Sequence, residues 1–231
     1  MGDSSDRSSG ARIDTLEVDG EGGHEPVDAE IVLFEGFDEL DVIGPFEVLE
    51  NGARAGASIS TRLVTLEPTD RVTASHGLRV EPDGTLGNPD LLIVPGGGWT
   101  SEDGGVRRAV EETTLPRAVA DRHEAGATLA SVCTGAMILA RAGILDGRPA
   151  ITHHDAVDDL AEVATIIDAR VVDDGDVLTA GGVTSGLDLA LWLLEREFGE
   201  QVAERVAREM EHDRRGSIHR SSDPPGPSTS S

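Results

Sequence analysis

The chain has 231 residues, with 44 acidic and 19 basic side chains and a formal net charge of −25. This charge argues against nucleic-acid binding, which needs a basic face for phosphate contacts, and the single cysteine excludes an intramolecular disulfide framework. The sequence has neither an apolar run of 18 residues nor an apolar N-terminal segment, so we expect a cytoplasmic protein without a membrane span or a secretory signal.

Residues 29–215 show the alternation of strand and helix patterns that is typical of one α/β domain, whereas 1–28 and 216–231 have the composition of disordered tails. We expect strands at 29–34, 59–66, 90–94, 127–132, 150–152, 170–172 and 177–179, with a small hairpin from 72–75 and 78–81. We expect helices at 39–54 with Asp38 as N-cap, 105–125 interrupted at Pro116, 134–142, 156–163 and 184–211. This order predicts a mostly parallel sheet sandwiched by helices, with the ligand beyond the carboxyl ends of the strands.

The segment from Ala130 to Ala136 joins a predicted strand to a predicted helix and contains the only cysteine, Cys133. Its neighbours are small, as the tight turn of a nucleophile elbow requires. A helix N-terminus stabilises a thiolate, so this placement predicts a lowered pKa for Cys133 and fast alkylation at pH 7. A lone cysteine is also commonly a buried structural residue.

Three glycines, 96–98, follow the strand predicted at 90–94. Backbone N–H groups of Gly97 and Gly98 can approach a ligand closely, and with the Thr134 N–H they are candidates for an oxyanion-binding site. The alternative is a simple turn. The run Gly181–Gly186 is a candidate turn with Thr184 or Ser185 as the N-cap of the last helix, and it can line a pocket at the same time.

Asp41 lies near the start of the first predicted helix, four residues before Pro45. Pro45 lacks the N–H that would bond the Asp41 carbonyl, so an irregular helix start could aim this carboxylate inward. On the residues alone, an acid that favours the helix dipole is the stronger interpretation, and Glu39 and Glu47 fit it as well.

Five stretches resemble, in order, the ThiJ/PfpI family: LDVIGPFEVL, DLLIVPGGG, ASVCTGAMILARAGILDGR, AITHH and LTAGGVTSGLDLALWL. The similarity covers about residues 29–212, and the D-x-x-G-P, V-C-T-G and G-G-V-T-x-G patterns resemble its isonitrile-hydratase branch. The resemblance implies a flavodoxin-like, class I glutamine amidotransferase-like fold and a homodimer. It implies Cys133 as nucleophile, Asp41 as general acid/base and Thr134 as an assisting residue, acting on a small-molecule substrate without a cofactor.

Two departures bear on the activity. Many members of the family carry Glu at the position of Asp41 and His at the position of Thr134, which disfavours a peptidase or deglycase and favours isonitrile hydration to a formamide. His154 stands where an aromatic residue is common, which changes the expected pocket shape. A glyoxalase-like enzyme and a ligand-sensing domain without enzymatic activity remain the alternatives.

His153, His154 and Asp155 offer metal-ligating atoms in consecutive positions. Adjacent side chains usually point in different directions, and the sequence supplies no second ligand pair, so we expect no metal site.

The 44 acidic residues are spread along the chain, which has no lysine at all. Such a surface is typical of proteins adapted to high salt, although an ordinary acidic cytosolic protein is the alternative. At low ionic strength these charges repel one another with little screening, so we expect the melting temperature to rise between low and molar KCl. Thermal unfolding in a KCl series checks this, and an unchanged melting temperature would exclude the halophilic interpretation.

Overall fold

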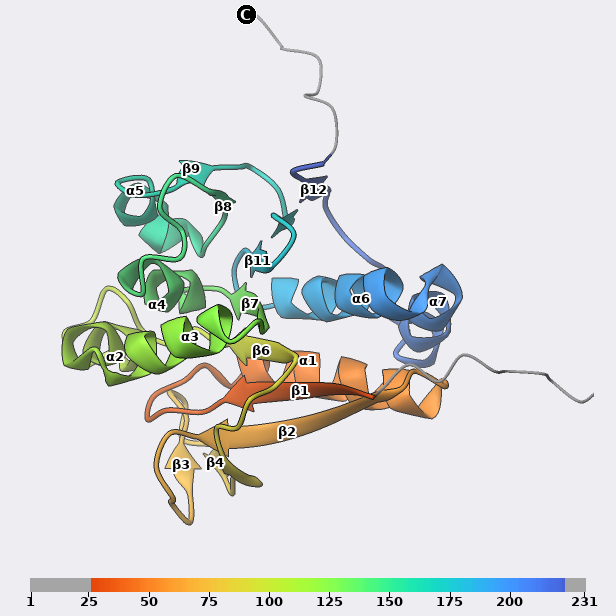
Figure 1. The fold of residues 1–231 in the computed structure, drawn as a ribbon, viewed down its shortest axis with the longest axis horizontal. Coiled ribbons are helices and arrows are strands. Elements are labelled where there is room, and N and C mark those ends of the chain that lie inside the picture. The colour runs from red at the N-terminus through yellow and green to blue at the C-terminus, as the bar shows by residue number, and fades with distance from the viewer. Residues whose placement is uncertain (1–25, 223–231) are drawn as a thin grey trace, which may run out of the picture.

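The computed structural model describes residues 26–222, which form an eight-stranded central sheet with helices on both faces (Figure 1). The strand order is β12 (Ile218–Arg220), β10 (Val171–Asp173), β11 (Val177–Ala180), β7 (Thr128–Val132), β6 (Leu91–Val94), β1 (Val27–Val32), β2 (Ile59–Thr65) and β5 (Gly84–Thr85). Neighbours run parallel except β10 and β11, which are antiparallel. The predicted mostly parallel α/β sheet is confirmed.

Alternation along the strands sends side chains to opposite faces of the sheet. Ile31 of β1 packs in one hydrophobic cluster, with α1 (Glu39–Arg54), α6 (Ser185–Phe198) and α7 (Glu200–Glu209). The next residue, Val32, packs in the other cluster, with α2 (Gly105–Glu112), α3 (Thr114–Glu124), α4 (Gly135–Arg141) and α5 (Val157–Leu160). Figure 1 shows these two helical layers on either side of the sheet.

The smaller elements lie outside the main sheet. The predicted hairpin is present as β3 (Val72–Thr73) and β4 (Arg79–Val80), which pair antiparallel. The strand expected at 150–152 is instead β8 (Pro149–Ala150), which pairs with β9 (Thr165–Ile166) in a separate two-stranded sheet. A short 3₁₀ turn, η1 (His154–Ala156), precedes α5. In the described part of the chain, no helix is long and apolar enough to cross a membrane.

Two predicted helices are each divided in the structure. The first divides at Thr113, which has a left-handed conformation (φ 62°) and whose N–H closes α2 on the Ala109 carbonyl at 3.1 Å. Pro116, the expected interruption, lies in the first turn of α3, where its missing N–H leaves no bond unmade. The closing helix divides at Gly199 (φ 91°), where the chain turns from α6 into α7.

The predicted domain boundary at residue 215 is too early. Strand β12 lies within the expected C-terminal tail. It pairs in parallel with β10, and Ile218 lies opposite Val171. At the other end, Val27 and Asp28 already belong to β1. The remaining parts of the two predicted tails, 1–25 and 223–231, lie outside the described residues.

Candidate active site

The turn from β7 to α4 has the strand-to-helix geometry predicted for Cys133. Cys133 has a positive φ of 56°, a strained conformation for a residue with a side chain. Its N–H donates to the Gly181 carbonyl at 2.9 Å, and its carbonyl accepts from Thr152 Oγ1 at 2.9 Å. A Cβ at Gly135 would lie 2.2 Å from the Val94 carbonyl oxygen, so only glycine fits after Thr134. These contacts fix the backbone that carries the thiol.

Asp41 is fully buried on α1, beside the elbow. Its Oδ2 accepts a hydrogen bond from the Gly96 N–H at 2.8 Å, whereas within residues 26–222 its Oδ1 has no hydrogen-bond partner. Burial raises the pKa of Asp41 to about 8, and the Asp38 charge adds to this increase, while interactions with Gly96 and the Cys133 side chain oppose it. A buried carboxyl that gains and loses a proton near neutral pH, next to a thiol, is suited to acid–base work.

The glycine loop, residues 96–98, connects Asp41 to the elbow. The Gly97 N–H donates to Thr134 Oγ1 at 3.1 Å. This N–H is therefore occupied in this structure, where it holds the loop to the Thr134 side chain, and this argues against its predicted role as an oxyanion donor. Gly97 itself has φ 144°, and a Cβ there would lie 2.3 Å from the Gly36 carbonyl oxygen. Gly98 lines the same cavity as Cys133, so the prediction stands for Gly98.

The sign of the predicted Cys133 pKa shift is wrong. Burial raises the pKa of the thiol to about 12, and a charge on Asp41 adds to the increase. The backbone N–H groups of Val183 and Thr134 interact with the sulfur and lower its pKa, but by less. The helix N-terminus therefore acts in the expected direction and is outweighed by desolvation and by the neighbouring carboxylate.

Iodoacetamide should accordingly alkylate Cys133 more slowly at pH 7 than it alkylates a free cysteine, because little thiolate is present. Above about pH 8, where Asp41 is ionised, Asp41→Asn removes the carboxylate charge that raises the thiol pKa and should speed alkylation. The rate, followed against pH by mass spectrometry, gives the apparent pKa. A wild-type value at or below the free-thiol reference of roughly 8.5 would contradict this expectation.

A cavity of about 170 Å³ opens above the thiol. It is lined by Asp38, Gly97, Gly98, Trp99, Thr100, Cys133, Thr134, His153, Asp155 and Val183. Trp99 forms an aromatic wall, which the hydrogen bond from its Nε1 to Asp159 Oδ2 (2.5 Å) fixes in place. Val183 has φ 30° and lines the cavity from the run Gly181–Gly186, which agrees with a pocket-lining turn. Thr184 of the same run is the N-cap residue of α6, without a side-chain cap hydrogen bond.

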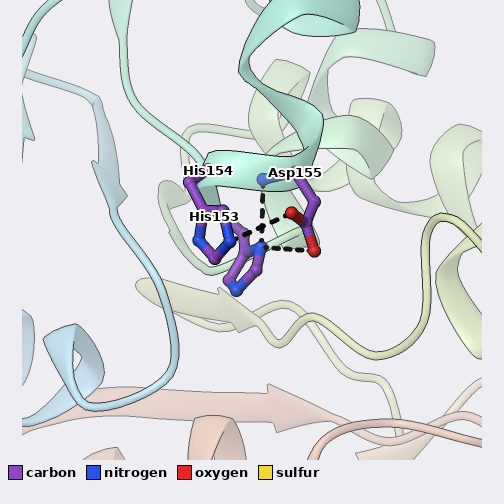
Figure 2. Close-up of side chains that lie close together, drawn as sticks. All are labelled: His153, His154 and Asp155. Carbon is purple, nitrogen blue, oxygen red and sulfur yellow. Dashed lines mark hydrogen bonds and ion pairs between the residues drawn. The ribbon is translucent and has the colours of Figure 1, made fainter.

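His153 and Asp155 line this cavity, and His154 lies close to both of them (Figure 2). The His153 Nδ1 accepts a hydrogen bond from the Asp155 N–H at 3.2 Å, and His154 Nε2 lies 3.0 Å from Asp155 Oδ1. One ligand atom from each residue lies within 4.8 Å of the others. Adjacent side chains were expected to diverge, but here the 3₁₀ turn brings these three to one side. Divergence is therefore no argument against a metal site here. His154 and Asp155 are exposed.

Some residues of the site have no distinctive signal in the sequence. Asp38 is confirmed as the N-cap of α1, accepting from the Leu40 N–H at 3.1 Å, but its place in the cavity wall was not predicted. Trp99 was likewise not assigned to the wall, whereas His153 was expected at the same edge of the sheet as Cys133. The position of Trp99, directly after three glycines at a strand end, is the one available hint for it.

Comparisons with known proteins agree with the fold and the motifs. The DJ-1/PfpI family model matches residues 28–196. The chain is 33% identical to the isonitrile hydratase of Pseudomonas putida over 189 residues, 78% of this chain and 76% of that protein. It is 30% identical to the HTH-type transcriptional regulator CdhR of Pseudomonas aeruginosa, covering 77% of this chain but 53% of the regulator.

Among solved structures, a ThiJ/PfpI family protein from Pseudomonas syringae superposes with a TM-score of 0.72 at 28% identity. The match covers 89% of this chain and 79% of that one. The family model spans well over half of the chain. The chain belongs to the DJ-1/PfpI family.

Proposed function

We propose that this chain is a cysteine-dependent enzyme that hydrates isonitriles to N-substituted formamides, with Cys133 as nucleophile and Asp41 as acid and base. The observation that carries the proposal is the buried Asp41 carboxyl, with one oxygen held by Gly96 and the other unpartnered within residues 26–222, next to the thiol. The similarity to the isonitrile hydratase of Pseudomonas putida supports the choice of substrate.

The reaction begins with a proton on the thiol and none on Asp41. Asp41 accepts the Cys133 proton while the sulfur attacks the terminal isonitrile carbon, and it then delivers that proton to the same carbon. A C–S bond and a C–H bond have formed, which gives a thioimidate. Because the Asp41 carboxylate is regenerated, the same group is available for the second half of the reaction.

Water completes the reaction. Asp41 removes a proton from water as the oxygen adds to the thioimidate carbon, and the proton passes to the substrate nitrogen. Asp41 then takes the hydroxyl proton while the C–S bond breaks, and returns it to the Cys133 sulfur. The net change is addition of one water to the isonitrile. Thr134 assists by holding the glycine loop against the elbow through its Oγ1.

Steady-state assays on a panel of isonitriles and 2-oxoaldehydes test the proposal. We expect isonitrile turnover with kcat/KM rising as the pH increases through about 8, because Asp41 must lose its proton before it can accept the one from Cys133. Cys133→Ser is the matched control and should be inactive. Turnover of oxoaldehydes alone would favour the glyoxalase-like alternative.

A ligand-sensing domain is the second candidate, because the chain is 30% identical to part of a transcriptional regulator. A sensor would bind small molecules in the cavity and turn none of them over. Binding by calorimetry without turnover of any isonitrile or oxoaldehyde would therefore favour the sensor.

We also propose, from the family, that the chain is a homodimer that acts on small molecules in the cytoplasm without nucleic acid, membrane or cofactor. Light scattering in molar KCl should give twice the mass of the 24.2 kDa chain, and a monomer mass would remove this part of the proposal.

A further inference from the structure

The ionisable side chains in the wall of the Cys133 cavity are acidic or neutral at pH 8. Besides the thiol, the wall contains Asp38, Asp155 and His153, and within residues 26–222 no arginine or lysine lines it. Burial and the neighbouring His154 lower the pKa of His153 below its ordinary value, so His153 carries no charge there. The fixed charge of the wall is therefore negative.

Asp38 acts on the reacting groups although it does not touch them. Its charge raises the pKa of both Asp41 and Cys133. The guanidinium of Arg107, which does not line the cavity, lies 5.3 Å from the centroid of the Trp99 ring and pairs with Glu111 at 3.2 Å. A carboxylate in this position opposes formation of the thiolate, an effect that a positively charged substrate would offset.

Asp155 contributes from the side of the cavity formed by η1. Its oxygens face the two histidine rings, 3.0 Å from His154 Nε2 and 3.6 Å from His153 Nδ1 (Figure 2). Asp38, by contrast, comes from the start of α1, so the two carboxylates reach the cavity from separate segments of the chain. Both residues line the cavity that contains Cys133.

We propose that Asp38 and Asp155 make this site selective for small substrates with a positive charge and exclude carboxylates. The cavity, about 170 Å³, suits a small substrate. The choice of substrate rests on the proposed hydration. If that is correct, the preferred substrate is an isonitrile whose amino nitrogen lies two or three bonds from the isonitrile nitrogen.

Modification of the thiol tests the charge selectivity without any enzymatic turnover. A methanethiosulfonate reagent transfers its thioalkyl group to the cysteine: the new S–S bond forms as the S–SO₂ bond breaks, and methanesulfinate leaves. Cys133 is the only thiol of the chain, so intact mass reports its modification. We would compare three methanethiosulfonates, which carry an ethyltrimethylammonium, an ethylsulfonate or a methyl group, at pH 8 in the presence of EDTA. The rate for each reagent would be divided by the rate at which the same reagent modifies 2-mercaptoethanol.

The normalised rate should be highest for the cationic reagent and lowest for the sulfonate. Removing one carboxylate should slow modification by the cationic reagent a few-fold and speed modification by the anionic reagent a few-fold. Asp38→Asn and Asp155→Asn should therefore each lower the ratio of the cationic to the anionic rate roughly tenfold. Asparagine is also a good N-cap, so Asp38→Asn retains the start of α1. The ratio should also fall as salt rises from about 0.05 M to 1 M.

Glu124→Gln is the matched control, because Glu124 is exposed and ends α3 ahead of β7, at the opposite end of that strand from Cys133. It should leave the ratio unchanged. A wild-type ratio near one, or a ratio that neither aspartate variant lowers, would overturn the proposal.

Three isonitriles with seven non-hydrogen atoms each give the second measurement: 2-(dimethylamino)ethyl, 3-methylbutyl and the anion 3-isocyanopropanoate. We expect kcat/KM to fall in that order. The three kcat/KM values should differ less in the two aspartate variants than in the wild type. Equal values for the three would overturn the charge selectivity. Turnover of none of them would remove the proposed hydration, while the thiol-modification ratio would still decide the charge inference.

Discussion

Asp41→Asn should lower kcat for isonitrile hydration by about 100- to 10,000-fold, the range that general acid–base catalysis typically contributes. The variant retains an oxygen that can accept the Gly96 N–H but has no group that can carry the proton between sulfur, carbon and water. Steady-state kinetics on a neutral isonitrile provide the measurement. Hydration by Asp41→Asn at the wild-type rate would show that the Cys133–Asp41 mechanism is wrong.

Two further substitutions sharpen this test. Asp41→Glu keeps the carboxyl but moves it by one methylene, and we expect activity to be lost because a displacement of about 1 Å can lower the rate 100-fold. Glu47→Gln is the control on the same helix, since Glu47 is exposed. Glu39, also interpreted above as a helix acid, is a poorer control. It accepts from the His76 N–H at 2.8 Å and the Ser75 hydroxyl at 3.1 Å, contacts that attach the β3–β4 hairpin to α1.

Asp41→Asn should also stabilise the fold, increasingly as the pH rises from about 4 to 8. In the folded protein the pKa of Asp41 is about 8, against about 4 in the unfolded chain, so the folded state binds the proton more tightly. Between these values the unfolded chain ionises Asp41 first, and the free energy of unfolding of the wild type falls as pH rises. At pH 7 the loss amounts to about 4 kcal/mol, which the neutral amide avoids.

Denaturant unfolding of the wild type and Asp41→Asn in molar KCl at several pH values measures this difference. The two proteins should differ least near pH 4, and Glu47→Gln should follow the wild type throughout. Parallel pH curves for wild type and Asp41→Asn would mean that the carboxyl ionises equally well in the folded and unfolded states. The expected combination, a more stable but inactive variant, is typical of a residue kept for chemistry.

A local pattern was sufficient to single out Cys133, whereas Asp41 was singled out only by the resemblance to the family. Cys133 stands at the end of a predicted strand and before small residues, a pattern that indicates the turn that the structure shows. The sheet followed from the alternation of element types. In both cases the information lies within a few consecutive residues.

Properties that depend on distant neighbours were not predictable in this way. The sign of the Cys133 pKa shift depends on burial and on Asp41, 92 positions earlier in the chain, and no periodicity reports either. The Gly97 N–H points to Thr134 because two loops meet, which a run of glycines does not reveal. The division at Thr113 was missed because a threonine in a left-handed conformation has no sequence signal comparable to glycine or proline.

The position of β12 has a consequence for aggregation. A strand at the border of a sheet offers unpaired N–H and C=O groups to other chains, and proteins commonly shorten or cover such borders. Here one border is β5, which is two residues long, and at the other β12 covers β10. Removing the residues after Arg215 would leave the Val171–Asp173 backbone open to pairing with a second molecule. The last described residues therefore contribute to colloidal solubility as well as to the fold.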